Sequence, residues 1–215
     1  MHRSYREIKD TYIEMIFRFA LAAEYRDETT GAHLARIGDY CVEIARESGM
    51  SKRQIEYLRY ASLLHDIGKL AIPDSILKKH AAGLTRKQRK IIEGHPGVGE
   101  DILRGSRSLL LRAASQICLT HHERFDGSGY PRGLKGKGIP LFGRIVAVAD
   151  VFDALTSKRT YKGAYGFERA LEIIKKESGS HFDPEIVKAF LKRKKRIRRI
   201  WEATHEIEDF SRLAV

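Results

Sequence analysis

Apolar residues recur at spacings of three and four along almost the whole of this 215-residue chain, and alternating strand patterns are scarce. This spacing is typical of amphipathic helices, whose buried faces must pack against one another. His33, Ile37, Cys41 and Ile44, for example, share one face of an expected helix. A chain of this length can bury a substantial core. We therefore predict a single all-α domain.

Local signals fix where several of the helices begin. Ser51 followed by Gln54 has the pattern of a capping box, and we expect this helix to run to His65-Asp66. Asp183 followed by Pro184 is typical of a helix start and should open the last long helix. Residues 126–140 contain five glycines and two prolines, which predicts a long loop. Further helices are expected after Thr85, from Pro96, and over 109–120, 141–155 and 167–176.

Composition excludes several classes of protein. A hydrophobic fraction of 42% with 32% charged residues is ordinary for a soluble globular protein. Two cysteines, Cys41 and Cys118, exclude a disulfide scaffold and an all-cysteine zinc site, and they favour the cytoplasm. The most apolar early stretch, residues 12–23, carries Glu14 and Arg18. It therefore predicts neither a transmembrane segment nor a signal peptide.

The net charge of +12 initially suggests a polyanionic partner. Residues 192–199, however, contain seven basic residues and no acid, so more than half of the net charge lies there. Apolar residues run through the same stretch, which indicates the solvated face of a terminal helix. No nucleic-acid-binding motif accompanies the charge, and we expect no specific nucleic-acid binding.

Several histidines and acids stand in apolar surroundings. His65-Asp66 follows an apolar run, and Asp150 is flanked almost entirely by apolar residues. One such pair alone would be read as a helix-end acid beside a solvated histidine. Burying an unpaired carboxylate is unfavourable, so a metal ion or a basic partner is expected. His33, His95, His121 and His122 occupy similar settings.

These seven side chains offer imidazole and carboxylate ligands without a thiolate. This donor set suits Fe, Mn, Ni or Zn in a catalytic site. Seven ligands are too many for one ion, but a bridging carboxylate can serve two. Such a pair can hold a hydroxide and clamp a phosphate oxygen, which suits phosphoester hydrolysis. Lys69, four residues after His65, is near enough to reach a phosphate.

At this point the sequence resembles a known family. His33, His65-Asp66 and Asp150 match the H…HD…D signature of the HD hydrolase superfamily, and residues 121–131, HHERFDGSGYP, resemble the defining motif of the HD-GYP subfamily. The similarity spans roughly residues 21–191. Further matching motifs are HDIGK at 65–69, IPD at 72–74, DVFDALT at 150–156 and HFDP at 181–184.

The resemblance implies an HD-domain-like helical bundle that hydrolyses cyclic di-GMP to pGpG, which family members often convert further to GMP; the sequence leaves open which product accumulates. It implies two divalent metal ions, with iron favoured over manganese or another metal. His33, His65, Asp66 and Asp150 would hold one ion, and Asp66 would bridge to a second ion on His95, His121 and His122. Lys69 would assist at the scissile phosphate. The substrate would be contacted by Arg159, Lys162, Asp153 and Tyr130.

Two departures from the family pattern stand out. Some members use a Glu four residues before the first metal-binding His to hold a third metal, but that position is Thr29 here, so we expect two metals. Residues 77–85 replace a typical Lys-Pro-Gly segment and leave substrate preference open.

We expect three regions: a linker-like helix over 1–20, the catalytic domain over 21–191 and a basic helical extension over 192–215. Family members usually follow a receiver or sensor domain, and the first helix could end such a linker. Its apolar stripe makes a homodimer plausible. A diguanylate cyclase is a further candidate partner.

Two alternatives remain at this stage. One is an HD hydrolase of another cyclic or polyphosphorylated nucleotide. The other is a non-catalytic module that binds cyclic di-GMP or a protein partner, although degenerate relatives usually lose ligands and all seven are present here.

Overall fold

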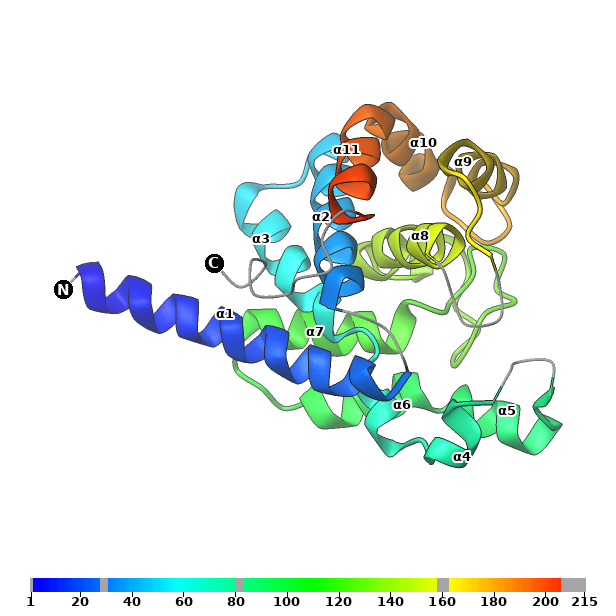
Figure 1. The fold of residues 1–215 in the computed structure, drawn as a ribbon, viewed down its shortest axis with the longest axis horizontal. Coiled ribbons are helices and arrows are strands. Elements are labelled where there is room, and N and C mark those ends of the chain that lie inside the picture. The colour runs from blue at the N-terminus through cyan, green and yellow to red at the C-terminus, as the bar shows by residue number, and fades with distance from the viewer. Residues whose placement is uncertain (1, 28–30, 80–82, 158–162, 206–215) are drawn as a thin grey trace.

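The computed structural model describes residues 2–27, 31–79, 83–157 and 163–205, and these residues form an array of helices (Figure 1). Across these ranges the only extended pairing is an isolated bridge between Ser178 and Phe182. The all-α prediction is confirmed. The α-helices are α1 His2–Glu24, α2 Gly31–Glu47, α3 Lys52–Ala61, α4 Asp74–Leu77, α5 Arg86–Ile92, α6 His95–Leu103, α7 Leu109–Thr120, α8 Leu141–Thr156, α9 Phe167–Lys176, α10 Pro184–Lys192 and α11 Lys194–His205.

The capping signals hold at the predicted places. Ser51 and Gln54 form a reciprocal capping box at α3, and Asp183 caps α10 by accepting a hydrogen bond from the Glu185 backbone N–H. Thr85 and Gln88 form a second box at α5. Each satisfies backbone donors that have no partner inside the helix, which is why these residue types mark helix starts.

Two predicted helices end earlier than their apolar pattern indicates. The helix from Ser51 ends at Ala61, and the chain continues as short 3-10 segments, η2 Ser62–Leu64 and η3 Ile67–Ala71. Leu63, Leu64 and His65 are all buried in this segment. The last long helix also breaks, at Arg193, into α10 and α11.

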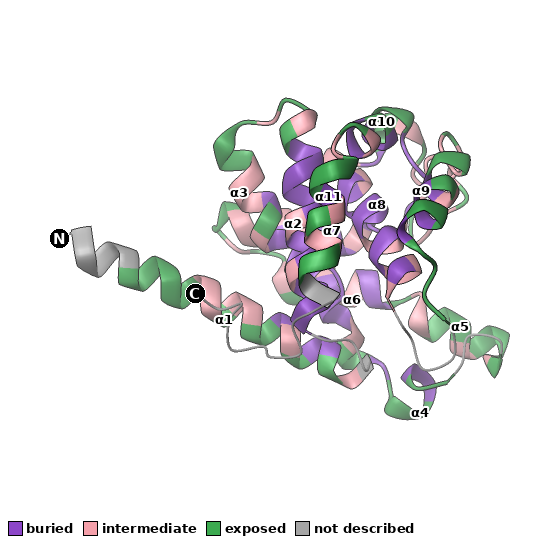
Figure 2. Cartoon of the chain, turned by 45° about the horizontal axis from the view of Figure 1, so that its top comes forward, coloured by how far each residue is buried: buried purple, intermediate pink, exposed green. Residues whose placement is uncertain are grey.

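The core surrounds α2 and α8, the most completely buried helices in Figure 2. Tyr40, Phe152 and Phe190 are fully buried, and their rings meet edge to face. From α11, Ile197 enters this core, while most of the basic residues of 192–199 stay exposed, as expected for a solvated face.

The first helix stands apart from the rest. The N-terminal part of α1 projects from the body, and its C-terminal end packs against η2, η3 and α2 (Figure 1). Ala20 and Ala23 are buried, whereas Tyr12 and Phe19 are exposed. In the part of the chain that the structure describes, no helix has the length and hydropathy needed to cross a bilayer.

Candidate metal centre

The predicted metal ligands come from separate elements and meet in one largely buried region. His33 lies in the first turn of α2, Asp150 lies on α8 and His95 begins α6. His65 and Asp66 occupy the turn between η2 and η3, and His121 follows the last residue of α7. Segments far apart in the sequence thus deliver imidazoles and carboxylates to the same place.

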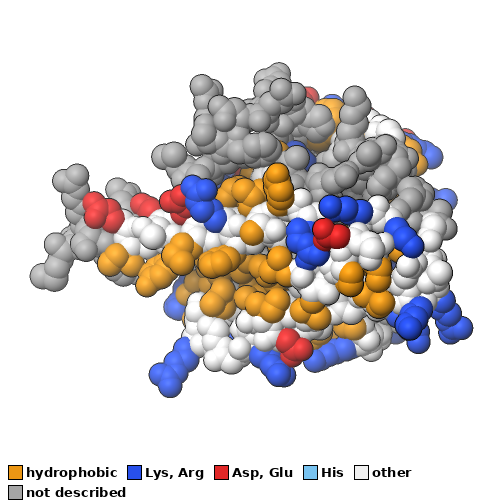
Figure 3. All heavy atoms as spheres, turned by 60° about the horizontal axis from the view of Figure 1, so that its bottom comes forward, with side chains coloured by type: hydrophobic (Ala, Val, Ile, Leu, Met, Phe, Trp, Pro, Cys, Tyr) orange, Lys and Arg blue, Asp and Glu red, His pale blue; other side chains and the backbone are white. Residues whose placement is uncertain are grey.

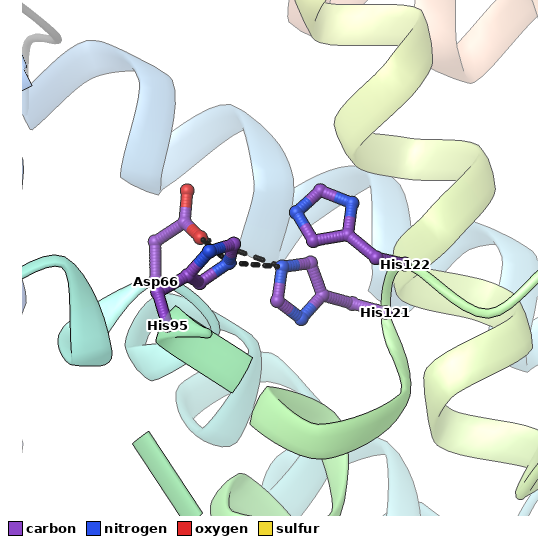
Figure 4. Close-up of side chains that lie close together, drawn as sticks. All are labelled: Asp66, His95, His121 and His122. Carbon is purple, nitrogen blue, oxygen red and sulfur yellow. Dashed lines mark hydrogen bonds and ion pairs between the residues drawn. The ribbon is translucent and has the colours of Figure 1, made fainter. Parts of the chain in front are cut away.

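Asp66, His95, His121 and His122 form the first group of possible ligands. One donor atom from each lies within 4.8 Å of the others. Asp66 Oδ1 is 3.0 Å from His95 Nε2 and 3.4 Å from His121 Nε2. Figure 4 shows the three rings and the carboxylate converging on a common point.

His33 and His65 form a second group, together with Glu24 at the end of α1, again within 4.8 Å of one another. Asp150 lies beside it, with Oδ1 3.9 Å from His65 Nε2. Asp66 lies between the two groups, because its Oδ2 is 3.4 Å from His65 Nε2 while Oδ1 faces the first group. Glu24 was not predicted from the sequence, since it precedes His33 by nine residues and resembles any acid of an amphipathic helix.

The orientation of the imidazoles suits metal binding. Nδ1 of His65 lies 2.9 Å from the Ser62 carbonyl oxygen, and Nδ1 of His95 lies 2.7 Å from that of Ile92. His121 Nδ1 lies 2.9 Å from the Cys118 carbonyl oxygen. These contacts fix each ring with Nε2 toward the centre, as hydrogen bonds to the other ring nitrogen do for metal-bound histidines.

Several buried polar atoms here lack a hydrogen bond, although Asp66 Oδ1 lies close to ring nitrogens of His95 and His121. Among the described residues, none forms a hydrogen bond with either Glu24 carboxylate oxygen, with His65 Nε2 or with Asp66 Oδ1. Buried polar atoms are normally paired, because an unsatisfied one is unfavourable by about 1–3 kcal/mol. Divalent cations would satisfy all four atoms, so the residues present fit a metal centre.

The electrostatics favour the metal-binding forms of His121, His122 and Asp66. Burial lowers the pKa of His121 and lowers that of His122 further, so both rings are neutral near pH 7. Burial opposes ionisation of Asp66, but Lys69 and His65 hold its pKa well below the usual range. Burial also works against protonation of His65, yet the neighbouring Asp66 raises its pKa to about 10. A bound cation would displace that proton.

Lys69 reaches the centre from η3. Its Nζ lies 2.6 Å from Asp66 Oδ2. The segment can approach α6 because residue 68 is glycine: a Cβ there would lie 2.0 Å from the His95 carbonyl oxygen. Arg26 holds the same segment from outside, donating to the carbonyl oxygens of Lys69, Leu70 and Ile72.

The structure corrects the role expected for Asp153. Its side chain is fully buried and faces α2, where Oδ2 lies 2.7 Å from His33 Nδ1. Arg36 donates to both of its oxygens. Burial works against ionisation, but Arg36 and His33 hold the Asp153 pKa below its usual range. Asp153 therefore positions His33 and pairs with a buried arginine, and it has no surface left for substrate.

The glycine-rich loop after the histidine pair is confirmed and covers one side of the centre. The Tyr130 ring stacks on His122, with centroids 4.8 Å apart. Glu123, which sequence analysis did not single out, is buried and accepts hydrogen bonds from the Arg132 and Leu134 backbone N–H groups. Gly129 permits this fold, because a Cβ would lie 2.2 Å from the Arg124 backbone nitrogen.

Two of the predicted substrate-binding residues are among those that the structure does not describe. Arg159 and Lys162 lie outside the described residues, as do Thr29 and part of the unusual 77–85 segment.

Comparison with known proteins identifies the family. A family model described as an HD domain matches residues 20–186. The chain is 45% identical over 193 residues to a cyclic di-GMP phosphodiesterase of Thermotoga maritima, covering 90% of this chain and 52% of that protein. It is 42% identical over 185 residues to the 3′3′-cGAMP-specific phosphodiesterase 2 of Vibrio cholerae, covering 86% and 35%. The chain thus spans about half or less of these relatives.

A solved structure supports the fold. A cyclic GMP-AMP specific phosphodiesterase of V. cholerae superposes with a TM-score of 0.66 at 21% identity, covering 92% of this chain and 54% of that one. Because the family model covers most of the helical array and all the histidines of the centre, the chain belongs to the HD domain family, as its HD-GYP-like motifs indicated.

Proposed function

We propose that this chain is a metal-dependent phosphodiesterase that hydrolyses cyclic di-GMP to pGpG, with GMP as the product of any second cleavage. The observation that carries the proposal is the position of Asp66 between two groups of buried ligands, with Lys69 Nζ 2.6 Å from it. This arrangement suits two ions that share one carboxylate. Iron is the first candidate and manganese the second, since both accept imidazole and carboxylate ligands.

Two divalent ions would activate the attacking water and neutralise charge on the phosphate. The side chains of the site would hold these ions and stabilise the charge on the phosphate. Asp66 stays ionised and holds the two groups together, and the imidazoles are fixed by their backbone partners. Lys69 brings a positive charge to the scissile phosphate and stabilises the charge that develops there.

The substrate-binding residues are proposed from their positions in the sequence motifs. Arg159 and Lys162 follow the DVFDALT segment and would bind the phosphates of the dinucleotide, since a guanidinium can hold a phosphate by two hydrogen bonds. Tyr130, stacked on His122, would form the wall next to the ions.

A second candidate substrate is 3′3′-cGAMP. The relative from V. cholerae that is 42% identical to this chain is named as specific for it. The two dinucleotides share the cyclic phosphate ring and differ in one base, so the same metal centre would serve either. The base contacts would decide between them.

An anaerobic preparation would test the proposal. The metal content is measured first, and product formation from cyclic di-GMP and from 3′3′-cGAMP follows on the same sample. We expect about two ions per chain and hydrolysis of cyclic di-GMP. Preferred cleavage of 3′3′-cGAMP would make that dinucleotide, and not cyclic di-GMP, the substrate. Binding of either dinucleotide without cleavage would indicate a non-catalytic module.

Asp66→Asn provides the matched test of the bridge. It should lose an ion and abolish turnover, whereas Asp101→Asn, at an exposed acid paired with Arg104, should change neither. Full turnover by the Asp66 variant would contradict the two-metal site.

We also propose that a second copy of the chain pairs along α1. Ile8, Tyr12, Met15 and Phe19 are exposed at spacings of four, three and four, which is the pattern of a coiled-coil seam. Figure 3 shows hydrophobic side chains following the projecting helix and continuing onto the body beside it. Tyr12→Glu with Phe19→Glu should convert a dimer to a monomer in light scattering, whereas Asp10→Lys should not.

The proposed location of the protein is the cytoplasm. Both cysteines are buried free thiols, which suits the reducing cytoplasm. A receiver or sensor domain preceding α1 would act through this helix, whose end reaches the metal centre, and a diguanylate cyclase is the candidate partner of opposite activity.

A further inference from the structure

Glu24 is a buried acid for which the proposed reaction gives no role. It is the last residue of α1, and only 1% of its surface is exposed. Neither of its carboxylate oxygens has a hydrogen-bond partner within the part of the chain that is described. An ionised carboxylate removed from water in this way requires a compensating positive charge.

The side chains facing Glu24 are ligands. Its carboxylate lies within 4.8 Å of a ring nitrogen of His33 and of His65. Nδ1 of His33 is engaged by Asp153, and Nδ1 of His65 by the Ser62 carbonyl. Nε2 of each ring is therefore the nitrogen left to bind. Two imidazoles and one carboxylate form a donor set that first-row divalent metals commonly occupy.

The nearby arginines do not supply the missing charge. Arg26, two residues further along, donates to Asp74 and to the carbonyls of 69, 70 and 72. Arg36, on α2, is engaged by Asp153 and Ser157. Both are held by other partners, so the His65 ring is the cationic group left to face Glu24 in the metal-free protein, and a bound metal ion would take its place.

We propose that Glu24 is a ligand of the ion held by His33 and His65, so that α1 contributes directly to the metal centre. This inference rests on the proposed function and adds a ligand to it. The ion would be held from α1, α2, the η2–η3 turn and, through Asp150, α8.

The test compares two buried glutamates changed to the isosteric amide. Glu24→Gln should retain one Mn²⁺ and bind the other at least about tenfold more weakly than wild type in calorimetry and elemental analysis. The Mn²⁺-induced rise in melting temperature should shrink.

Glu43→Gln is the control. Glu43 is also buried, but it binds Arg46 and Arg193, away from the ligands. This variant should have a lower metal-free melting temperature and an unchanged Mn²⁺ affinity.

The outcomes separate the two proposals. Unchanged Mn²⁺ affinity in Glu24→Gln would overturn the ligand assignment while leaving the phosphodiesterase proposal intact. A lower metal-free melting temperature with unchanged Mn²⁺ binding would likewise overturn it, because Glu24 would then be paired with the His65 imidazolium. Wild-type protein that binds two ions without cleaving a cyclic dinucleotide would contradict the proposed reaction and leave the role of Glu24 standing.

Discussion

Lys69 Nζ lies 2.6 Å from Asp66 Oδ2, and both side chains are largely buried. Burial alone would favour the neutral acid, but the ammonium and the neighbouring His65 hold the pKa of Asp66 well below its usual range. A negative carboxylate is thus kept at the junction of the two ligand groups. In the proposed reaction the same ammonium would also stabilise charge on the scissile phosphate.

Replacing Lys69 with Met should show whether the lysine acts on the phosphate or by keeping Asp66 ionised. We expect kcat to fall about 10²-fold, the magnitude seen when one charge-stabilising donor is removed, with the metal content preserved. Turnover at saturating Mn²⁺ and elemental analysis measure the two quantities. Lys78→Met, at an exposed lysine paired with Asp74, should stay within about twofold of wild type. Loss of an ion from the Lys69 variant would show that the lysine acts by organising Asp66 instead.

Asp153→Asn should destabilise the fold. The change leaves the buried Arg36 without its ionic partner, and breaking such a pair lowers the free energy of unfolding by about 3–5 kcal/mol. Urea denaturation measures the effect. Asp39→Asn, which removes a more exposed pair with Arg59, should lower it by about 0–1 kcal/mol. Unchanged stability with a raised KM would instead restore the substrate-binding role expected from the sequence.

The fold and most of the ligands were predictable because their signals are local. Capping residues such as Ser51 with Gln54 mark helix starts, and His65-Asp66 or His121-His122 are recognised within short motifs. The ends of the helices were less predictable. At Ala61 the apolar pattern continues, yet the chain changes to a 3-10 segment, so the hydrophobic spacing alone did not mark this end.

The residues that were missed depend on contacts distant in the sequence. Asp153 was assigned to substrate from its motif, but its partner Arg36 lies 117 positions away. Glu24 gives no local sign of its role, because only the packing of α1 against η2 and η3 turns its carboxylate toward His33 and His65. The spacing of residues along the chain does not show which distant side chains come into contact.

His181 should give the protein an acid-sensitive contribution to stability. Burial and the nearby Arg124 lower its pKa to about 4. The unfolded state binds this proton at higher pH, so the contribution is present above about 6.5 and is lost as the pH falls toward 4. The full effect corresponds to about 3 kcal/mol, and partial solvent contact reduces it to about 1–2 kcal/mol.

His181→Gln should therefore flatten the dependence of unfolding free energy on pH between 6.5 and 4. Urea denaturation of metal-free protein at several pH values gives the difference between variant and wild type, which cancels the titration of the other histidines. Parallel curves for the two proteins would contradict the assignment.

Gly68→Ala should damage the metal centre through the backbone. The new Cβ would lie 2.0 Å from the His95 carbonyl oxygen and 2.6 Å from the Gly99 nitrogen, so η3 and α6 must separate. Asp66 lies at the start of η3 and His95 at the start of α6, which means that this movement pulls two ligands of one group apart. We expect Mn²⁺ affinity to fall at least about tenfold, as when supporting contacts of a metal site are lost.

Gly97→Ala is the matched control, because it lies in the same helix α6 and its added Cβ meets nothing within 4 Å. Alanine is a better helix former than glycine by about 0.8–1 kcal/mol, so this variant should melt at a slightly higher temperature and bind Mn²⁺ normally. Calorimetry and thermal unfolding distinguish the two substitutions. Equal Mn²⁺ affinity in both variants would show that the close approach of η3 to α6 does not set the geometry of Asp66 and His95.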